Sequence, residues 1–375
     1  MGRTIESMIL TGTQDSSRRE NRPASRSGEQ KEAATIEDAK GKAVESATLT
    51  GTQKSSEVSS FAHQKEAKPI AIDGRGDLYS VAYLADGKHF VRGDKEGKIR
   101  RWRVEDGKEV GTPMDAGSTV FNIAVLQDGR WIVSGAWSGL VTVWDAESHS
   151  KVTEFKAHND RVRAVDVSPD GTRIATGSYD KTACVWFLST GQRLLGPLEH
   201  DNRLAAAKFS PNGRLIATAT RNSKVRICDS YNGGHLVEFP IQVYSALNQS
   251  LTWAIDSKQL FVLSNDGNIH CLDVSTGTTL SKWAIHSSDK ARCISLASNG
   301  TFIAASANSS ISFWDTATRK QIRSVIKETH DVWSMAISTN YDLVTSGSKT
   351  IILRGLCDIL PYCYFDHVRL REKTL

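Results

Sequence analysis

From about residue 68 onward, short segments alternate apolar and polar side chains and are separated by turn sequences. In the clearest unit, the alternation over residues 162–167 predicts a half-buried strand. The Ser168-Pro-Asp-Gly171 segment that follows predicts a tight turn, because proline presets φ and glycine accepts a positive φ. Further strands are predicted at residues 173–177, 183–186 and 193–195. The unit is therefore expected to contain four short antiparallel strands and no helix.

One position of this unit recurs along the chain at a nearly constant spacing. It is occupied in successive units by Trp102, Trp144, Trp186, Cys228, Leu272 and Trp314. The first four of these residues stand 42 positions apart, and the next two steps are 44 and 42 residues. A period in this range, with four strands in each repeat, is typical of the blades of a β-propeller. Because each blade would bury its apolar faces against its neighbours, the repeats are expected to form one cooperative domain.

Further residues that recur in phase with this period carry a family resemblance. They are the dipeptides Trp144-Asp145 and Trp314-Asp315, the turns Asp128-Gly129, Ser168–Gly171 and Ser210–Gly213, and the histidines His158, His200, His286 and His330. Over roughly residues 68–354 this pattern resembles the WD40-repeat family. It also resembles, less specifically, the stand-alone WD40 proteins of filamentous and mushroom-forming fungi. The resemblance implies an all-β fold, a β-propeller of four-stranded antiparallel blades.

The number of blades follows from the number of inner strands. These are expected to begin near Tyr79, Phe121, Arg163, Ala205, Gln249, Arg292 and Trp333, which gives seven blades. The last unit loses its pattern after Arg354, before an outer strand. The missing strand has a candidate at residues 68–73, directly before the first blade. Since WD40 rings usually close with an N-terminal strand, and closure removes unpaired strand edges, we predict a ring closed in this way.

Two flanking segments differ from the repeats. Residues 1–67 are rich in Ser, Thr, Glu, Lys, Ala and Gln and contain no aromatic residue before Phe61, so a disordered arm is predicted. The tail of residues 355–375 begins with a strongly apolar stretch and ends with basic residues. We expect it to pack on the propeller, with an exposed docking peptide as the alternative.

Composition and charge narrow the class of protein. The chain has 375 residues, a hydrophobic content of 39% and a net charge of +5, and no apolar run long enough for a membrane helix or a signal peptide. Its six cysteines lack metal-ligand spacing and suit core thiols in a reducing compartment. These features predict a cytoplasmic protein, with the nucleus as the alternative, and no membrane partner, metal or cofactor. We expect a monomeric propeller that acts within a larger assembly.

Blade three contains a set of polar residues that resembles a catalytic triad in composition. In the WD40 family such residues hold the blade together, and the resemblance assigns this structural role to His158, Ser178, Asp180 and Trp186. The chain shows no nucleotide-binding loop, no zinc-protease helix and no nucleophile elbow. A protein that is not an enzyme is predicted, and catalysis stays a remote alternative.

Candidate binding residues follow from the way WD40 rings bind partners. These rings mainly use the top face, which carries the turns that enter the inner strands and the turns that link the second strand to the third. Two positions in each blade point there, and they give the candidates Tyr79, Lys95, Phe121, Trp137, Arg163, Tyr179, Arg221, Arg292 and Trp333. Large aromatic residues crowd blades seven, one, two and three. Because aromatic and arginine side chains dominate protein–protein hot spots, a protein or peptide partner on the top face is predicted.

Two other interpretations remain open. Arg163, Arg221, Arg292 and the arm could bind nucleic acid or a ribonucleoprotein, although the small net charge and the mixed signs of the arm disfavour this. The chain could also be the remaining sensor portion of a larger multidomain receptor.

Overall fold

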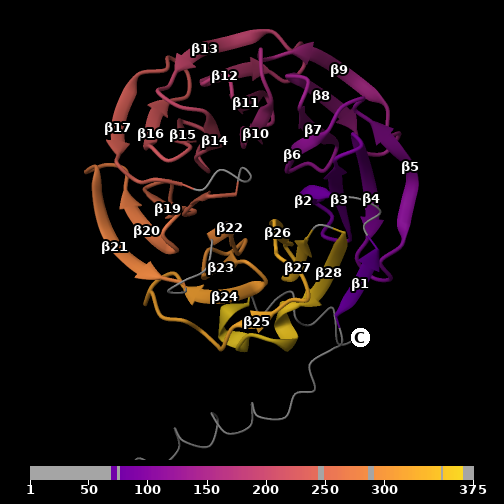
Figure 1. Cartoon of the computed structure of the whole chain (residues 1–375), viewed down its shortest axis with the longest axis vertical. Coiled ribbons are helices and arrows are strands. Elements are labelled where there is room, and N and C mark those ends of the chain that lie inside the picture. The colour runs from indigo at the N-terminus through magenta and orange to yellow at the C-terminus, as the bar shows by residue number, and fades with distance from the viewer. Residues whose placement is uncertain (1–68, 74–76, 244–248, 286–290, 348, 366–375) are drawn as a thin grey trace, which may run out of the picture. The chain divides into compact units, whose positions relative to one another are not determined.

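A computed structural model describes most of the region that carries the repeats. The described residues are 69–73, 77–243, 249–285, 291–347 and 349–365. Within them the chain forms seven four-stranded antiparallel sheets arranged as a ring around a central channel (Figure 1). The predicted seven-bladed β-propeller is therefore confirmed. The predictions for the arm, for His286 and for the tail beyond residue 365 lie outside the described residues.

The first four blades run outward from the channel in chain order. Blade one comprises β2 (Leu78–Tyr83), β3 (His89–Asp94), β4 (Lys98–Arg103) and β5 (Glu109–Asp115). Blade two comprises β6 (Val120–Val125), β7 (Trp131–Ala136), β8 (Leu140–Asp145) and β9 (Lys151–Lys156). Blade three comprises β10 (Val162–Val167), β11 (Arg173–Ser178), β12 (Thr182–Phe187) and β13 (Arg193–Glu199). Blade four comprises β14 (Leu204–Phe209), β15 (Leu215–Thr220), β16 (Val225–Asp229) and β17 (His235–Phe239).

The last three blades complete the ring, and the outer strand of blade seven comes from the other end of the chain. Blade five comprises β18 (Leu251–Trp253), β19 (Gln259–Leu263), β20 (Asn268–Asp273) and β21 (Thr278–Ala284). Blade six comprises β22 (Ala291–Leu296), β23 (Phe302–Ala307), β24 (Ser310–Asp315) and the short β25 (Ile326–Lys327). Blade seven comprises β26 (Ser334–Ile337), β27 (Asp342–Ser346), β28 (Thr350–Gly355) and β1 (Ile70–Asp73).

The ring closes through the pairing of β1 with β28, as predicted. The register places Ile70 opposite Leu353 and Ile72 opposite Ile351. Ile72 is buried against apolar residues of blades seven and one. The sheet that closes the ring thus combines residues 277–283 positions apart in the sequence.

The apolar core lies between neighbouring blades. Val133 of blade two packs with Val162 and Trp186 of blade three, and Trp144 of blade two packs with Val91 of blade one. Because every blade buries its faces against the next, no blade completes its core alone. The top face consequently depends on the closed ring.

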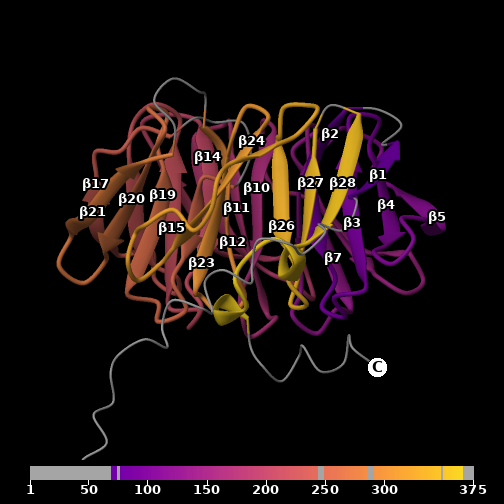
Figure 2. The ribbon, with the colours of Figure 1, turned by 90° about the horizontal axis from the view of Figure 1, so that it is seen from below.

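The strands run between two faces, as the side view in Figure 2 shows. The top face carries the turns that enter the inner strands and those that join the second strand to the third. Gly139 lies in such a turn, with φ of +80°, and an added Cβ would stand 2.2 Å from the carbonyl oxygen of His158. Only glycine fits so close an approach between two turns, so the turns of blades two and three are held in direct contact.

Residues 356–365, which follow β28, pack against blades six and seven at the opposite face. They contain two short 3-10 helices, η2 (Leu356–Asp358) and η3 (Tyr362–Tyr364). Leu360 and Phe365 are buried, and the Phe365 ring lies 4.8 Å from the ring of Tyr341. Asn299 of blade six donates a hydrogen bond to the Tyr364 carbonyl at 2.9 Å. This segment therefore leaves the top face uncovered.

Candidate functional site

A backbone irregularity positions side chains at the top of the inner strands. In blades one, two and three, the register between the first and second strands skips the second residue of the inner strand. The skipped residues are Tyr79, Phe121 and Arg163, and blades four and six show the same shift at Ala205 and Arg292. A β-bulge leaves one residue out of the hydrogen-bonded ladder and re-aims its side chain. The side chains of neighbouring blades can therefore meet around the mouth of the channel.

Four aromatic rings from blades seven, one and two form a continuous chain on this face. The centroids of Trp333 and Tyr79 are 5.9 Å apart, with the rings stacked. Tyr79 lies 5.2 Å from Phe121, and Phe121 stacks on Trp137 at 5.7 Å. These separations are those of favourable aromatic pairs. Residues predicted from two positions of the repeat, in three blades, thus form one series of contacts.

Arginine side chains extend the chain into blades three and four. The guanidinium carbon of Arg161 lies 3.3 Å from the ring centroid of Trp137, and that of Arg163 lies 4.1 Å from Phe121. Tyr179 is contacted by Arg163 at 5.3 Å and by Arg203 at 5.1 Å. These are cation–π contacts within the usual range. We call the connected group the aromatic–arginine sector, and its members are Trp333, Tyr79, Phe121, Trp137, Arg161, Arg163, Tyr179 and Arg203.

The sector has a buried floor and an exposed rim. Phe121 is 3% exposed and Arg163 is 9% exposed, so these two side chains mainly support their neighbours. Trp137 is 48% exposed, and Arg203 is also exposed. Burial lowers the pKa of the Arg163 guanidinium, the Tyr179 and Tyr79 rings act in the opposite direction, and Arg161 and Arg221 lower it further.

The remaining predicted residues have other surroundings. Lys95 lies 3.8 Å from Asp77 in an ion pair, and Arg292 lies 3.4 Å from Asp331. Arg221 follows β15 directly and is half-buried.

The sequence analysis did not predict Arg161 and Arg203. Both directly precede the first residue of an inner strand, and they stand 42 residues apart, so the repeat period itself carries a signal for them.

The polar set of blade three forms a connected series of hydrogen bonds. Trp186 Nε1 donates to Thr176 Oγ1 at 2.9 Å, and the same hydroxyl lies 2.7 Å from His158 Nε2. His158 Nδ1 lies 2.9 Å from Asp180 Oδ2 and 3.0 Å from Thr182 Oγ1. Because the carboxylate accepts from Nδ1–H, Nε2 is free to accept from the threonine hydroxyl. The series therefore joins the top turn, the second strand and the third strand.

Sequence reasoning placed Ser178 in this series, and the geometry corrects it. Thr176 supplies the hydroxyl between His158 and Trp186. The Ser178 hydroxyl instead donates to the Asp160 carbonyl at 3.1 Å and accepts from the Asp180 N–H at 3.1 Å. Thr176 and Ser178 are two positions apart and point to the same side of β11, so the sequence alone does not show which hydroxyl joins His158 to Trp186.

The series is only partly reproduced in other blades. Trp144 Nε1 donates to Ser134 in blade two, and His200 Nε2 lies 2.9 Å from Thr218 Oγ1 in blade four. In blade one the corresponding position is Arg92, whose buried guanidinium lies 5.6 Å from the Trp102 ring. Blade three thus has the most complete polar link, next to the arginines of the sector.

A family model described as the IFT122 first beta-propeller matches residues 56–355. The chain belongs to this propeller family. A search of curated proteins gave no match. The resemblance to fungal stand-alone WD40 proteins stays a prediction.

Membership of the IFT122 first beta-propeller family agrees with a role as an interaction scaffold. No helix among the described residues is long and apolar enough to span a membrane. Within the same ranges, no group of three or more His, Cys, Asp or Glu side chains could hold a metal ion.

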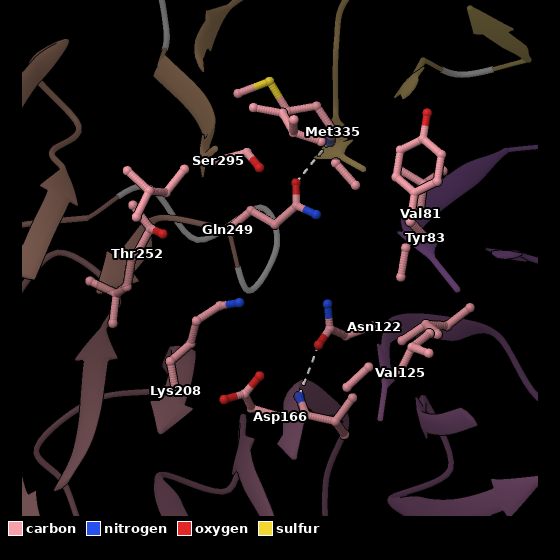
Figure 3. A pocket seen from close by; sticks show the side chains of 18 of the residues that line it. Val81, Tyr83, Asn122, Val125, Asp166, Lys208, Gln249, Thr252, Ser295 and Met335 are labelled. Carbon is pink, nitrogen blue, oxygen red and sulfur yellow. Dashed lines mark hydrogen bonds between the residues drawn. The ribbon is translucent and has the colours of Figure 1, made fainter. Parts of the chain in front are cut away.

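The central channel of this propeller contains a cavity of about 350 Å³ between the inner strands. Figure 3 shows polar side chains that cross from one inner strand to another. Asn122 Oδ1 accepts from the Val165 N–H at 2.9 Å, and Gln249 Oε1 accepts from the Met335 N–H at 2.9 Å. These contacts link neighbouring and distant blades around the channel. Their evident role is to hold the inner strands in register.

Asp180→Ala is expected to lower the melting temperature by several degrees at neutral pH, because it removes the acceptor of His158. Burial alone would raise the pKa of the Asp180 carboxyl, but hydrogen bonds from His158 and Thr182 outweigh burial and hold the pKa well below its usual value. The stabilisation is therefore present above the unfolded pKa of about 3.9 and is lost as the pH falls toward the folded value. Thermal melts of both proteins across acidic pH should converge. Equal melting at neutral pH would contradict the structural role.

Proposed function

We propose that this propeller is a non-catalytic scaffold that binds a protein or peptide partner on its top face through the aromatic–arginine sector. The observation that carries the proposal is the unbroken chain of ring contacts from Trp333 to Tyr179. Aromatic and arginine side chains are those that contribute most to protein–protein binding. Here they are gathered in one place by four blades.

The sector is also pre-organised, which favours binding. The exposed Trp137 stacks on the buried Phe121, and the half-buried Arg161 lies over Trp137. Ordering a flexible side chain at an interface costs about 0.5–1.5 kcal/mol, and a side chain already held by its neighbours avoids much of this cost. A partner that covers Trp137 would therefore gain apolar burial with little loss of entropy.

The nucleic-acid alternative receives less support from the same residues. Arg163 is nearly buried beneath aromatic rings, and Arg292 is paired with Asp331. Phosphate binding needs cations that reach the solvent, so two of the three arginines on which this alternative rests are poorly placed for it. The buried thiols Cys184, Cys228 and Cys271 agree with the proposed cytoplasmic or nuclear location.

Trp137→Ala is expected to weaken top-face binding by roughly 30-fold, the effect of removing a typical hot-spot side chain. A phage-displayed library of random linear peptides can be selected on the full chain, and the affinities of the selected peptides measured by fluorescence anisotropy. Tyr231→Ala is the matched control, because Tyr231 is 59% exposed and lies in the turn between β16 and β17 at the opposite face.

The control should bind the selected peptides as the wild type does, and both variants should keep near wild-type melting. Peptides that bind Trp137→Ala and the wild type equally well would contradict the proposed function.

A further inference from the structure

Three of the sector's five aromatic rings, those of Trp137, Phe121 and Tyr179, are already covered by the protein's own cations. Arg161 covers Trp137 at 3.3 Å, and Arg163 covers Phe121 at 4.1 Å. An aromatic surface commonly attracts a cationic side chain of a partner by the same cation–π interaction. On this face such a cation would meet a guanidinium group in place of a bare ring. A lysine-rich or arginine-rich segment therefore fits the sector poorly.

Positive charge accumulates beside the rings on blades three and four. We call the group Arg161, Arg163, Arg203 and Arg221 the arginine arc. Arg161 and Arg203 directly precede β10 and β14, Arg163 lies within β10, and Arg221 directly follows β15. These positions all belong to the top face. Burial is the first cause of the lowered pKa of Arg163, and repulsion by Arg161 and Arg221 adds to it, so these groups share one electrostatic environment.

Arg161 lies 3.9 Å from Asp160, but the other nearby carboxylates leave part of the charge of the arc unmatched. Asp180 is engaged by His158, and Asp201 accepts from Ser223 at 2.8 Å and lies 3.6 Å from Lys224. Across the described stretches of the chain, no carboxylate lies within 4.0 Å of the guanidinium nitrogens of Arg203 or Arg221.

Two other cations of the top face differ in this respect. Lys95 is paired with Asp77 in blade one, and Arg292 is paired with Asp331 near blades six and seven. Arg203 and Arg221 thus carry unmatched charge on blade four, beside Tyr179 of blade three. An apolar surface and an arc of arginines lie side by side.

We infer that the partner segment is an acidic peptide, with aspartate or glutamate carboxylates on Arg203 and Arg221 and an apolar or aromatic side chain against Trp137. This inference rests on the proposed function and names the chemistry of its partner. The planar guanidinium fork matches a carboxylate through two parallel hydrogen bonds. Complementary charge would also set the direction of the peptide across blades two to four.

The peptide selection tests this inference separately from the proposed function. Among selected peptides whose binding is lost in Trp137→Ala, we expect enrichment of aspartate and glutamate and depletion of lysine and arginine. Arg203→Gln combined with Arg221→Gln should weaken these peptides by roughly tenfold or more, and added salt should weaken binding to the wild type more than to the variant.

Arg214→Gln is the matched control, because Arg214 is an exposed arginine in the turn between β14 and β15 of the same blade, at the opposite face. It should bind like the wild type, and melting curves should show that all variants fold.

Neutral or basic peptides that depend on Trp137, or acidic peptides indifferent to the arginine pair, would overturn the inference while leaving the proposed function intact. Stronger binding of single-stranded oligothymidine than of the acidic peptides at the same arginines would overturn it in favour of nucleic acid. Peptides whose binding does not depend on Trp137 would overturn both the inference and the proposed function.

Discussion

Ile72→Asp is expected to lower the melting temperature of the propeller by roughly 10 °C, whereas Ala71→Asp on the same strand should change it little. Ile72 is buried against blades seven and one, and it pairs with Ile351 at the point where the ring closes. Ala71 lies next to it on the exposed side of β1. The two substitutions add the same carboxylate to the same strand, so only the burial differs.

The physical reason is the cost of an unpaired buried charge. Placing a carboxylate among apolar side chains costs about 3–5 kcal/mol when no partner compensates it, and the lost apolar burial adds to this. The chain can escape only by detaching β1, which would expose the edge of β28 and open the ring. Circular dichroism melts of the two variants and the wild type measure the effect. Equal melting of Ile72→Asp and the wild type would mean that β1 does not close the ring.

Thr176→Val is the second change with a large expected effect, a fall in melting temperature of roughly 5–10 °C. Valine has nearly the shape of threonine but lacks the hydroxyl that accepts from Trp186 and donates to His158. Two buried polar groups would then lose a partner at once, at about 1–3 kcal/mol each. The loss lies in blade three, between the turns that carry Arg161 and Tyr179.

Two further variants test whether the loss of stability comes from the Thr176 hydroxyl or from any substitution in β11. Thr176→Ser keeps the hydroxyl and should recover most of the stability. Ser178→Ala removes a hydroxyl of the same strand whose hydrogen bonds, within the described structure, are to backbone groups of Asp160 and Asp180. Its effect should be clearly smaller. If Ser178→Ala were as harmful as Thr176→Val, the series through Thr176 would not be the main polar link of the blade.

The fold could be predicted from the sequence because its signals repeat. One position recurs every 42–44 residues and is tryptophan in four of six units. Together with turns such as residues 168–171, it indicates both the strand count and the phase of each blade. The closing strand was predictable for the same reason, since the last unit ends at residue 355 without an outer strand and residues 70–73 supply one. A strand that is missing from one unit can therefore be recognised by comparison with the other units.

The details of the site were less predictable, because they depend on register and on contacts between blades. The choice between Thr176 and Ser178 depends on which hydroxyl lies opposite the indole of Trp186, and alternation along a strand does not distinguish them. The Lys95–Asp77 pair lies within blade one, and the Arg292–Asp331 pair joins β22 to the segment before β26, so the repeat pattern gave no sign of either pair.

Arg161 stands at a position of the repeat that differs from the two used to predict binding residues, although Arg203 occupies the same position one repeat later. It stands one place before the inner strand and reaches Trp137 of the preceding blade. The contact exists because Gly139 allows the turns of blades two and three to approach closely. The sequence near Arg161 does not indicate that the turns of blades two and three approach each other.

The most direct test of the central claim is hydrogen exchange of the full chain with and without a selected acidic peptide. Slower exchange is predicted in the top turns that include Trp137, Arg161 and Tyr179, with unchanged exchange in the turn that contains Tyr231. Protection confined to the opposite face, with none at these three turns, would contradict the assignment of the top face as the binding surface.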